Sequence, residues 1–413
     1  GPGAGPGEER GNGQEADGLL LREARAAPVL APPEAPRRKI AWAITVTFDG
    51  PFADGAVVLQ ESIQRTHPAA PAGAAAGAVY EHEFVALVHP NATAKSGRLL
   101  RRLGWRVVVA PLPVEAHEIQ TAFFRKHAPK SGCCGLAELI KLYAWTLDGY
   151  WRVVHLDMDS LVLGNMDELF SIDASLVYTC DYNMMNKGSR ARNPRAVCPV
   201  QGGFVVVRPD RVPFQGMLDL VREGRFGAGF KPGASGWNGT GIGHWWGGAT
   251  FQGVVPFWYA RLAERLVEPG GREKARVGKE ESGRFLSVEV DRCVYDNMVD
   301  DPVARPRVGT EACRATPLHQ VKNAHFTLCQ KPWTCGYPSF PDDKAGLCAS
   351  LHAKWFELRE AAAKRHGLDL GQPAGLSARK YHRGACAGGK YLPMASESKV
   401  MGRYIKGGAF VPN

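Results

Sequence analysis

The sequence predicts an α/β fold with a mostly parallel central sheet. Short apolar segments rich in Val, Ile and aromatic residues alternate along the chain with segments of helical periodicity. The 413 residues, of which 45% are hydrophobic and 22% charged, suffice for one large domain with appendages or for two domains. Because such alternation builds a doubly wound sheet, we expect ligands beyond the carboxyl ends of its strands.

The elements follow from the local pattern, taken in chain order. Continuous apolar or β-branched runs predict strands at 40–48, 84–89, 105–110, 151–156, 175–179 and 203–208. Apolar residues at helical spacing predict helices at 55–66, 96–103, 136–147, 212–223 and 349–365. Gly-rich or irregular composition predicts loops at 68–77, 183–199 and 224–248, the last of which we interpret as a substrate loop.

Composition also predicts the domain limits. Residues 1–38 are mainly Gly, Pro, Ala, Glu and Arg, which cannot bury a core, so we expect a flexible low-complexity segment there. We expect the ordered domain at 39–340 and a C-terminal extension at 341–413, with one helix and a basic tail. No stretch approaches the ~20 apolar residues that span a bilayer. The sequence does not begin with Met, so a missing N-terminal membrane anchor stays an open alternative.

The charge balance favours anionic ligands. Lys and Arg number 51 against 41 Asp and Glu, which gives a net charge of +10. Nucleotide phosphates or acidic glycans fit that balance, and a merely solvated basic surface fits it equally well. No nucleic-acid-binding motif accompanies the charge, so we expect no nucleic-acid partner.

The ten cysteines predict disulfides. They form no paired Cys-x-x-Cys set, which argues against a zinc site, and their even number fits several disulfides in an oxidising compartment. Cys329 and Cys335 are candidates to hold the loop between them, although the sequence does not identify their partners. Glycosylation sequons at Asn91 and Asn238 agree with a luminal protein. We therefore expect the secretory pathway, in the Golgi lumen, with the cytoplasm as the alternative.

Asp157 and Asp159 are the most informative residues of the chain. They close the apolar strand predicted at 151–156, and carboxylates two residues apart project to the same side of an extended chain. At a strand end both can bind one hard divalent cation, whose shell substrate phosphates and water would complete. Solvated acids at a strand end are the alternative when the motif stands alone.

Here further blocks accompany the motif. Their order and spacing resemble the glycogenin-like retaining glycosyltransferases of family 8. The resemblance covers roughly residues 40–335 and is carried by the blocks 45–59, 139–170, Gln201-Gly202-Gly203 and His325–Trp333. It implies a single GT-A-type nucleotide-sugar-binding domain.

The resemblance also implies a ligand set for a metal ion and a UDP-sugar donor. His325 would join Asp157 and Asp159 as the third metal ligand, and its imidazole suits Mn²⁺ better than Mg²⁺, which remains an alternative. An ordinary buried histidine is the other interpretation of His325. We expect donor-binding contacts from these ligands and from Thr47, Asp49, Phe52, Lys141, Met158, Gln201, Gly202, Gly203, Gln252, Leu328 and Lys331.

The chain departs from the family pattern at several positions. The family's arginine upstream of the helix that carries Lys141 has no clear match, with Lys130 as a substitute, and the tyrosine that glycogenin glucosylates on itself has no counterpart. Phe251 stands where relatives carry a carboxylate before the glutamine that corresponds to Gln252, and Leu328 replaces a glycine. With Trp245, Trp246, Trp258 and Tyr259 nearby, Phe251 could line an aromatic acceptor surface, and core packing is the equally weighted alternative.

We interpret the chain as a metal-dependent retaining glycosyltransferase that moves a hexose or related sugar from a UDP-sugar to a hydroxyl of a glycan, protein or polyol. Lys331 would neutralise the leaving diphosphate, and Gln252 would position the donor sugar or the acceptor. A catalytically silent nucleotide-sugar or glycan-binding protein is the main alternative. A nucleotidyl- or phosphoryl-transfer enzyme is disfavoured because the chain has no Gly-x-x-x-x-Gly-Lys-[Ser/Thr] loop. Donor sugar, acceptor, linkage and oligomeric state are left open.

Overall fold

A computed structural model describes most of the chain after residue 36. The described residues are 37–50, 53–68, 80–184, 197–229, 235–265, 285–300, 303–305, 309–336, 346–370, 381–394, 402–404 and 410–412. The predicted flexible segment at 1–38 therefore lies almost entirely outside them, and so does most of the loop predicted at 183–199.

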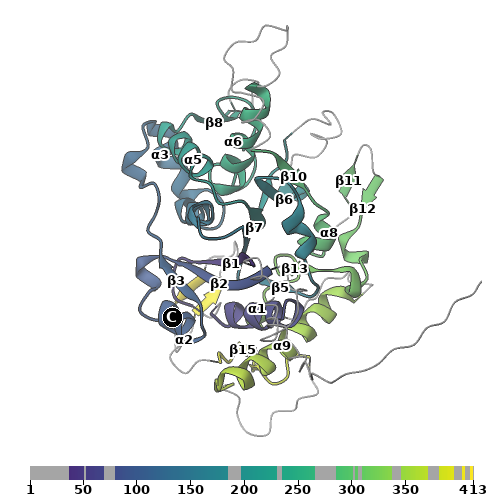
Figure 1. Ribbon diagram of the computed structural model, residues 1–413. Helices are drawn as coiled ribbons and strands as arrows, with labels where there is room; N and C mark the ends of the chain where they lie inside the picture. The colour runs from purple at the N-terminus through teal and green to yellow at the C-terminus, as the bar shows by residue number, and fades with distance from the viewer. Residues whose placement is uncertain are drawn as a thin grey trace, which may run out of the picture. The chain divides into compact units, whose positions relative to one another are not determined.

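Seven strands form the central sheet, in the order β10-β6-β7-β4-β1-β2-β3 (Figure 1). Each neighbouring pair is parallel except the two pairs that involve β7, which runs antiparallel to both β4 and β6. The predicted α/β class with a mostly parallel sheet is confirmed. The strands are β1 (Arg38–Val46), β2 (Tyr80–Val88), β3 (Arg106–Val109), β4 (Arg152–Leu156), β6 (Leu176–Cys180), β7 (Val200–Val207) and β10 (Ser287–Glu289).

Successive side chains of a strand point to opposite faces of the sheet, and here both faces are apolar, so helices cover both of them. On β1, Trp42 and Ile44 belong to one core cluster, whereas Ala41 and Ala43 belong to a second. The first cluster includes side chains of α1 (Ala53–Thr66) and α9 (Leu347–His366). The second includes side chains of α5 (Arg211–Glu223), α6 (Phe251–Arg265) and the 3-10 helix η4 (Gly135–Thr146).

The remaining elements are short. The helices are α2 (Ser96–Arg102), α3 (Ala122–His127) and α8 (Arg292–Tyr295), and the 3-10 turns are η1 (Pro90–Ala92), η2 (Ala116–Glu118), η3 (Ala128–Lys130), η5 (Asp167–Ser171), η6 (Tyr182–Met184), η7 (Cys313–Ala315), η8 (Leu318–Gln320) and η9 (Pro332–Thr334). Two-stranded pairs are formed by β5 (Ser160–Val162) with β13 (Asn323–His325), β8 (Phe226–Ala228) with β9 (Ser235–Trp237), β11 (Val303–Arg305) with β12 (Gly309–Glu311), β14 (Cys386–Ala387) with β15 (Lys390–Tyr391), and β16 (Gly402–Tyr404) with β17 (Phe410–Pro412).

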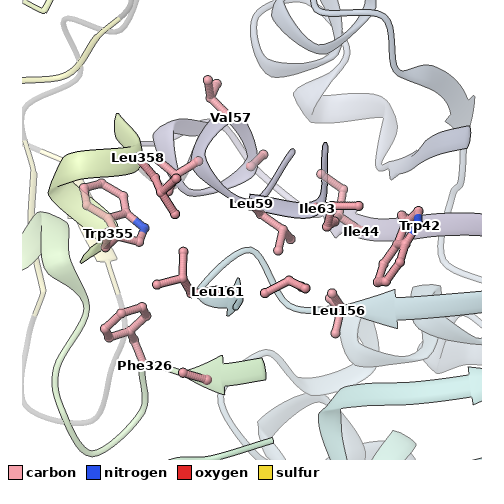
Figure 2. Close-up of a cluster of buried hydrophobic side chains, with 14 of the residues drawn as sticks. Trp42, Ile44, Val57, Leu59, Ile63, Leu156, Leu161, Phe326, Trp355 and Leu358 are labelled. Carbon is pink, nitrogen blue, oxygen red and sulfur yellow. The ribbon is translucent and has the colours of Figure 1, made fainter. Parts of the chain in front are cut away.

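The core between α1 and α9 anchors the segments that carry the candidate metal ligands. Figure 2 shows Leu59 of α1 and Trp355 of α9 around Leu161 and Phe326. Leu161 follows Asp159 by two residues, and Phe326 directly follows His325. Because both side chains are fully buried, the backbone that follows each candidate metal ligand is held by packing.

The C-terminal segment is linked covalently and by polar contacts to the rest of the molecule. Cys329 pairs with Cys348 at the start of α9, and Cys335 pairs with Cys386 of β14. Asp54 of α1 is buried, and it accepts a hydrogen bond of 2.6 Å from the Tyr391 hydroxyl. These contacts show how 341–413 is attached, while the predicted domain limits stay predictions.

Several elements differ from expectation, including β2, which begins at Tyr80, four residues before the predicted strand at 84–89. The helix predicted at 136–147 is present but winds as a 3-10 helix, and the strand predicted at 203–208 begins three residues earlier, at Val200. Helix α6 was not predicted, because its Gly253 and internal Pro256 interrupt the helical pattern. Among the described residues, no helix has the length and apolar composition needed to cross a membrane.

Candidate metal centre

The turn after β4 carries the two candidate carboxylates. The Asp157 N–H donates to the carbonyl of Gly203 at 3.1 Å, which extends the β4–β7 pairing by one bond. The Ser160 N–H donates back to the Asp157 carbonyl at 3.0 Å, closing a tight turn into β5. Both carboxylates reach the same cluster of side chains. The chain turns through Met158 and Asp159 after β4 ends, so this turn brings them together and the alternation of an extended strand does not.

His325 joins them through an antiparallel pair of strands. In the pairing of β13 with β5, His325 lies opposite Ser160, and the Phe326 N–H donates to the Asp159 carbonyl at 2.8 Å. The Nε2 atom of His325 is 3.4 Å from Asp159 Oδ1 and 4.0 Å from Asp157 Oδ2. Residues from distant parts of the sequence therefore converge as predicted.

This donor set fits a six-coordinate divalent cation. With bonds of about 2.1 Å, neighbouring donors in an octahedron lie about 3 Å apart and opposite donors about 4.2 Å apart. The separations of His325 Nε2 from Asp159 Oδ1, 3.4 Å, and from Asp157 Oδ2, 4.0 Å, lie between these two values, and the ligand atoms of all three residues lie within 4.8 Å of one another. Two carboxylates and one imidazole are ligands that Mn²⁺ accepts readily.

A fourth side chain, Asp296, faces the other ring nitrogen of His325. Asp296 Oδ1 lies 3.3 Å from His325 Nδ1, and its Oδ2 accepts a hydrogen bond of 2.9 Å from Thr179. Asp296 is 1% exposed, so this carboxylate can orient the imidazole. No sequence pattern pointed to Asp296, because it directly follows a four-residue helix in a region of mixed charge where we predicted no element.

The carboxylates of Asp159 and Asp296 favour the protonated form of His325. Burial lowers the pKa of His325, but the carboxylates of Asp159 and Asp296 outweigh that effect and raise it to about 10. Burial likewise raises the pKa of Asp159, and the charges of Lys331 and His325 reverse the effect and hold it well below its usual range. Without a cation, the positive charges of His325 and Lys331 balance the carboxylates.

Lys331 forms an ion pair with Asp159 Oδ2. It follows the loop that begins at His325 and directly precedes η9. The side chains of Lys331 and Asp157 are each 29% exposed, whereas those of Asp159 and His325 are 10% and 3% exposed. The centre therefore opens to solvent where Asp157 and Lys331 lie, and a diphosphate could approach from that side.

Lys141 is the second cation of the centre. Its ammonium group lies 2.8 Å from Asp157 Oδ1 and 3.0 Å from Glu138 Oε2, and it donates to the Gly202 carbonyl at 3.1 Å. Burial lowers the pKa of Lys141, but the carboxylates of Asp157 and Glu138 raise it well above its usual value. Lys141 is therefore a fixed positive charge that links η4, the turn after β4 and β7.

The start of β7 approaches the centre closely. A β-carbon on Gly203 would come within 2.2 Å of His325 Cε1, and one on Gly202 within 3.2 Å of Lys141 Nζ. The Gln201 side chain donates to Asp181 at 3.0 Å and accepts from the Gly203 N–H at 2.9 Å, so it shapes this strand. The two glycines thus allow the backbone to lie against both charged side chains.

The other predicted donor contacts are placed as follows. Asp49 Oδ1 accepts hydrogen bonds from the backbone and hydroxyl of Ser96, at 2.9 and 2.6 Å, and so binds the start of α2. Thr47 is half-buried just after β1, and the Met158 carbonyl lies against Gly55 of α1. Leu328 is 39% exposed, and Phe52 lies outside the described residues.

Gln252 lies beside this cluster, whereas the neighbouring aromatic residues mostly do not face solvent. Gln252 is buried at the start of α6, with its Cγ 3.5 Å from a β-carbon built on Gly202. Phe251 is fully buried and packs in the core with its ring tilted against that of Trp145, and Trp258 and Tyr259 are also buried. For these three residues the core-packing interpretation is confirmed. Trp246, at 56% exposure, keeps an open aromatic face.

Comparisons with known proteins agree with the resemblance. No protein-family model matches the chain. Over 127 residues it is 30% identical to Glycogenin-2 of Homo sapiens, a match that covers 31% of this chain and 22% of Glycogenin-2. The matched part therefore spans less than a quarter of the length of that relative.

Solved structures with a similar arrangement include several glycosyltransferases. They include WbbM, a bifunctional glycosyltransferase (TM-score 0.41, 13% identity, 79% of this chain and 51% of that chain), and the galactosyltransferase LgtC with donor and acceptor sugar analogues (0.40, 14%, 77% and 95%). GlyE of Streptococcus pneumoniae gives a TM-score of 0.39, with 10% identity over 80% of this chain and 62% of that chain. The sequence match to Glycogenin-2 confirms the predicted resemblance, and the chain is similar to glycogenin-like glycosyltransferases.

Proposed function

We propose that this protein transfers a sugar from a nucleotide-sugar donor to a hydroxyl acceptor, with a divalent cation at the centre formed by Asp157, Asp159 and His325. The observation that carries the proposal is their convergence with Lys331 and Lys141. Two carboxylates and an imidazole suit a cation, and the adjacent lysines suit a diphosphate. The similarity to Glycogenin-2 supports sugar transfer over other reactions that use this combination.

Each residue has a separate task in this proposal. When bound, the cation would stabilise negative charge on the departing nucleoside diphosphate. Lys331, half-open to solvent, would leave Asp159 and bind the diphosphate. Lys141 would hold Asp157 and the Gly202 carbonyl in place, and Gln252 would orient the donor sugar or the acceptor. The leaving phosphate oxygen can accept the acceptor proton, so a retaining reaction needs no protein base.

The finer assignments rest on chemistry and on the resemblance. We propose a UDP-sugar donor and retention at the anomeric carbon, as glycogenin-like enzymes imply. We propose Mn²⁺ because an imidazole in the ligand set favours it over Mg²⁺. The disulfides Cys180–Cys198, Cys293–Cys313, Cys329–Cys348 and Cys335–Cys386 support an oxidising compartment, and we propose the secretory pathway, in the Golgi lumen.

The test is Mn²⁺-dependent release of UDP from a panel of UDP-sugars, with and without sugar, protein and polyol acceptors. We expect release that EDTA stops and Mn²⁺ restores. Asp159→Asn keeps the shape of the side chain but removes a ligand charge, and should lower the rate by at least about a hundredfold. His325→Ala should be milder, because two carboxylates remain.

The matched control is Asp148→Asn, which removes an exposed carboxylate paired with Arg211 and should leave the rate unchanged. If neither transfer nor slow hydrolysis occurs across the whole panel, while UDP still binds with Mn²⁺, the protein is a silent nucleotide-sugar-binding protein and the enzymatic proposal is wrong. Near-normal turnover by Asp159→Asn would instead reject the metal site.

A further inference from the structure

Two cysteines stand apart from the four disulfides. Cys133 and Cys134 are both free and exposed, in the turn that leads into η4. Their Sγ atoms lie 2.8 Å apart. The sequence shows only that these residues are adjacent, whereas the structure directs both thiols toward each other.

A continuous polar chain connects this pair to the candidate metal centre. The Cys133 thiol donates to Glu138 Oε1 at 2.9 Å, and the other oxygen of Glu138 lies 3.0 Å from Lys141 Nζ. Lys141 in turn contacts Asp157 at 2.8 Å. Glu138 and Lys141 are 9% and 6% exposed, so little solvent screens these interactions.

The same turn is in contact with the loop before Gln252. A β-carbon on Gly132, the residue before Cys133, would lie 3.2 Å from the Cα of Gly247. A β-carbon on Gly247 would lie 2.3 Å from Gln252 Oε1. A change in the backbone at Cys133 can therefore reach both Lys141 and Gln252 through direct contacts.

Two chemistries fit two thiols and a carboxylate, and the geometry favours one. Cys133, Cys134 and Glu138 could bind a soft metal ion. However, two thiolates on one tetrahedral zinc ion, with bonds of about 2.3 Å, lie about 3.8 Å apart. The observed 2.8 Å is shorter, and Glu138 is already held by Lys141. Bond formation between the sulfurs fits this arrangement better.

We propose that Cys133 and Cys134 form a reversible disulfide between adjacent residues, and that this disulfide modulates the neighbouring nucleotide-sugar site. The oxidant is a small-molecule or protein disulfide, RSSR. Cys134 as thiolate attacks RSSR and releases RS⁻, and the Cys133 sulfur then attacks Cys134 and releases the second RS⁻. The two thiol protons end on these leaving groups, so the pair is oxidised by two electrons and one RSSR becomes two RSH.

The position of Glu138 fits this sequence of steps. The hydrogen bond with Cys134 and the Glu138 carboxylate raise the pKa of the Cys133 thiol, which therefore stays protonated until the second step. Glu138 can then accept the Cys133 proton through the existing hydrogen bond and pass it to the leaving sulfur.

This disulfide should be easier to reduce than the other four. Consecutive α-carbons are about 3.8 Å apart, whereas disulfides usually join α-carbons 4.4–6.8 Å apart. Closing the bond therefore strains the turn, and strained exposed disulfides have less negative reduction potentials. Oxidation also removes the Cys133 S–H donor from Glu138, which strengthens the attraction of Glu138 for Lys141 at the expense of Asp157.

The chemical test uses the full chain in glutathione buffers of graded redox poise, followed by alkylation and mass spectrometry of peptides. We expect Cys133 and Cys134 to lose two hydrogens together and to become alkylated at a milder reducing poise than the other eight cysteines. Thiols that stay alkylable in fully oxidising buffer, or a pair as hard to reduce as the others, would overturn the proposal. If Zn²⁺ protects both thiols from alkylation and the peptide loses no hydrogen, the pair is a metal site instead.

The functional test rests on the proposed function and compares UDP binding with saturating Mn²⁺ before and after oxidation. We expect the Kd for UDP to rise about fivefold on oxidation, because Lys141 shifts away from Asp157. A variant with both Cys133→Ser and Cys134→Ser keeps a hydroxyl donor for Glu138 and should bind UDP normally, without response to oxidant. Equal affinity of both redox forms would refute the coupling. Failure of the reduced protein to bind UDP would count against the proposed function and leave the thiol result intact.

Discussion

Gly203 lies directly against His325, and a β-carbon at Gly203 would come within 2.2 Å of His325 Cε1. The backbone of β7 can thus support the imidazole only if residue 203 has no side chain. Gly203→Ala should displace the ring from Asp159 and weaken Mn²⁺ binding by about tenfold or more. Isothermal titration of Mn²⁺ into the variant would measure this effect.

The control for that variant is Gly149→Ala, because a β-carbon there meets nothing within 4 Å. Its Mn²⁺ affinity should equal that of the unmodified protein. If Gly203→Ala binds Mn²⁺ normally while both variants are folded by circular dichroism, His325 is not a ligand.

Lys331 should affect cation and diphosphate binding in opposite directions. Its ammonium group is paired with Asp159, so it repels an incoming cation and occupies one of the ligand oxygens. Lys331→Gln should therefore bind Mn²⁺ more tightly in the absence of nucleotide, yet bind UDP about tenfold more weakly. Separate titrations with Mn²⁺ and with UDP would show these opposite changes. The control is Lys354→Gln, which replaces an exposed lysine of α9 and should change neither affinity. Parallel weakening of both ligands would contradict the assigned role.

Asp296 should affect Mn²⁺ affinity although its carboxylate is not one of the three candidate ligands. Its carboxylate lies 3.3 Å from His325 Nδ1 and can fix the ring orientation and make Nε2 a better donor. Asp296→Asn should lower Mn²⁺ affinity by about 10- to 100-fold. The exposed Asp173, paired with Arg208, provides the control variant Asp173→Asn, which should bind Mn²⁺ normally. Unchanged affinity in Asp296→Asn would mean that the packing of β13 alone positions His325.

Cation binding should become tighter as the pH rises. Burial lowers the pKa of His325, and Asp159 and Asp296 raise it to about 10, above the ordinary value of 6.5. A ligating imidazole must be neutral, so each cation displaces a proton, and affinity should rise by up to about tenfold per pH unit below pH 10. Titrations between about pH 6 and about pH 8 in buffers of different ionisation enthalpy would count the released proton. A flat profile would contradict this.

Protonated His325 has the opposite effect on folding when no cation is added. Its pKa is raised in the folded state, so the stability that it contributes is fully present below pH 6.5 and is lost as the pH rises through about 10. Urea unfolding in EDTA, across this range, should show a declining midpoint, and His325→Asn should show a smaller decline.

Local pattern was enough to predict most of the sheet and the place of the two aspartates at the end of β4. Period-two and period-3.6 spacing are properties of neighbouring residues, so β1, α1 and β4 were placed correctly within a few residues. Asp157 and Asp159 directly follow β4, so their place at the end of that strand was predictable, whereas the turn through Met158 brings the two carboxylates together. The position of His325 beside these carboxylates was predicted from the family resemblance, because no local sequence rule brings residue 325 beside residue 159.

The sequence by itself therefore determined the α/β class, the position of the paired aspartates and the presence of disulfides. Only the tertiary structure decided that β7 runs antiparallel between β4 and β6, which places Gly203 beside His325, and that Asp296 lies behind the same imidazole. It also decided that Phe251 is core and that Cys133 reaches Lys141 through Glu138. These contacts join distant segments, and their partners are chosen by strand pairing and burial across the whole core.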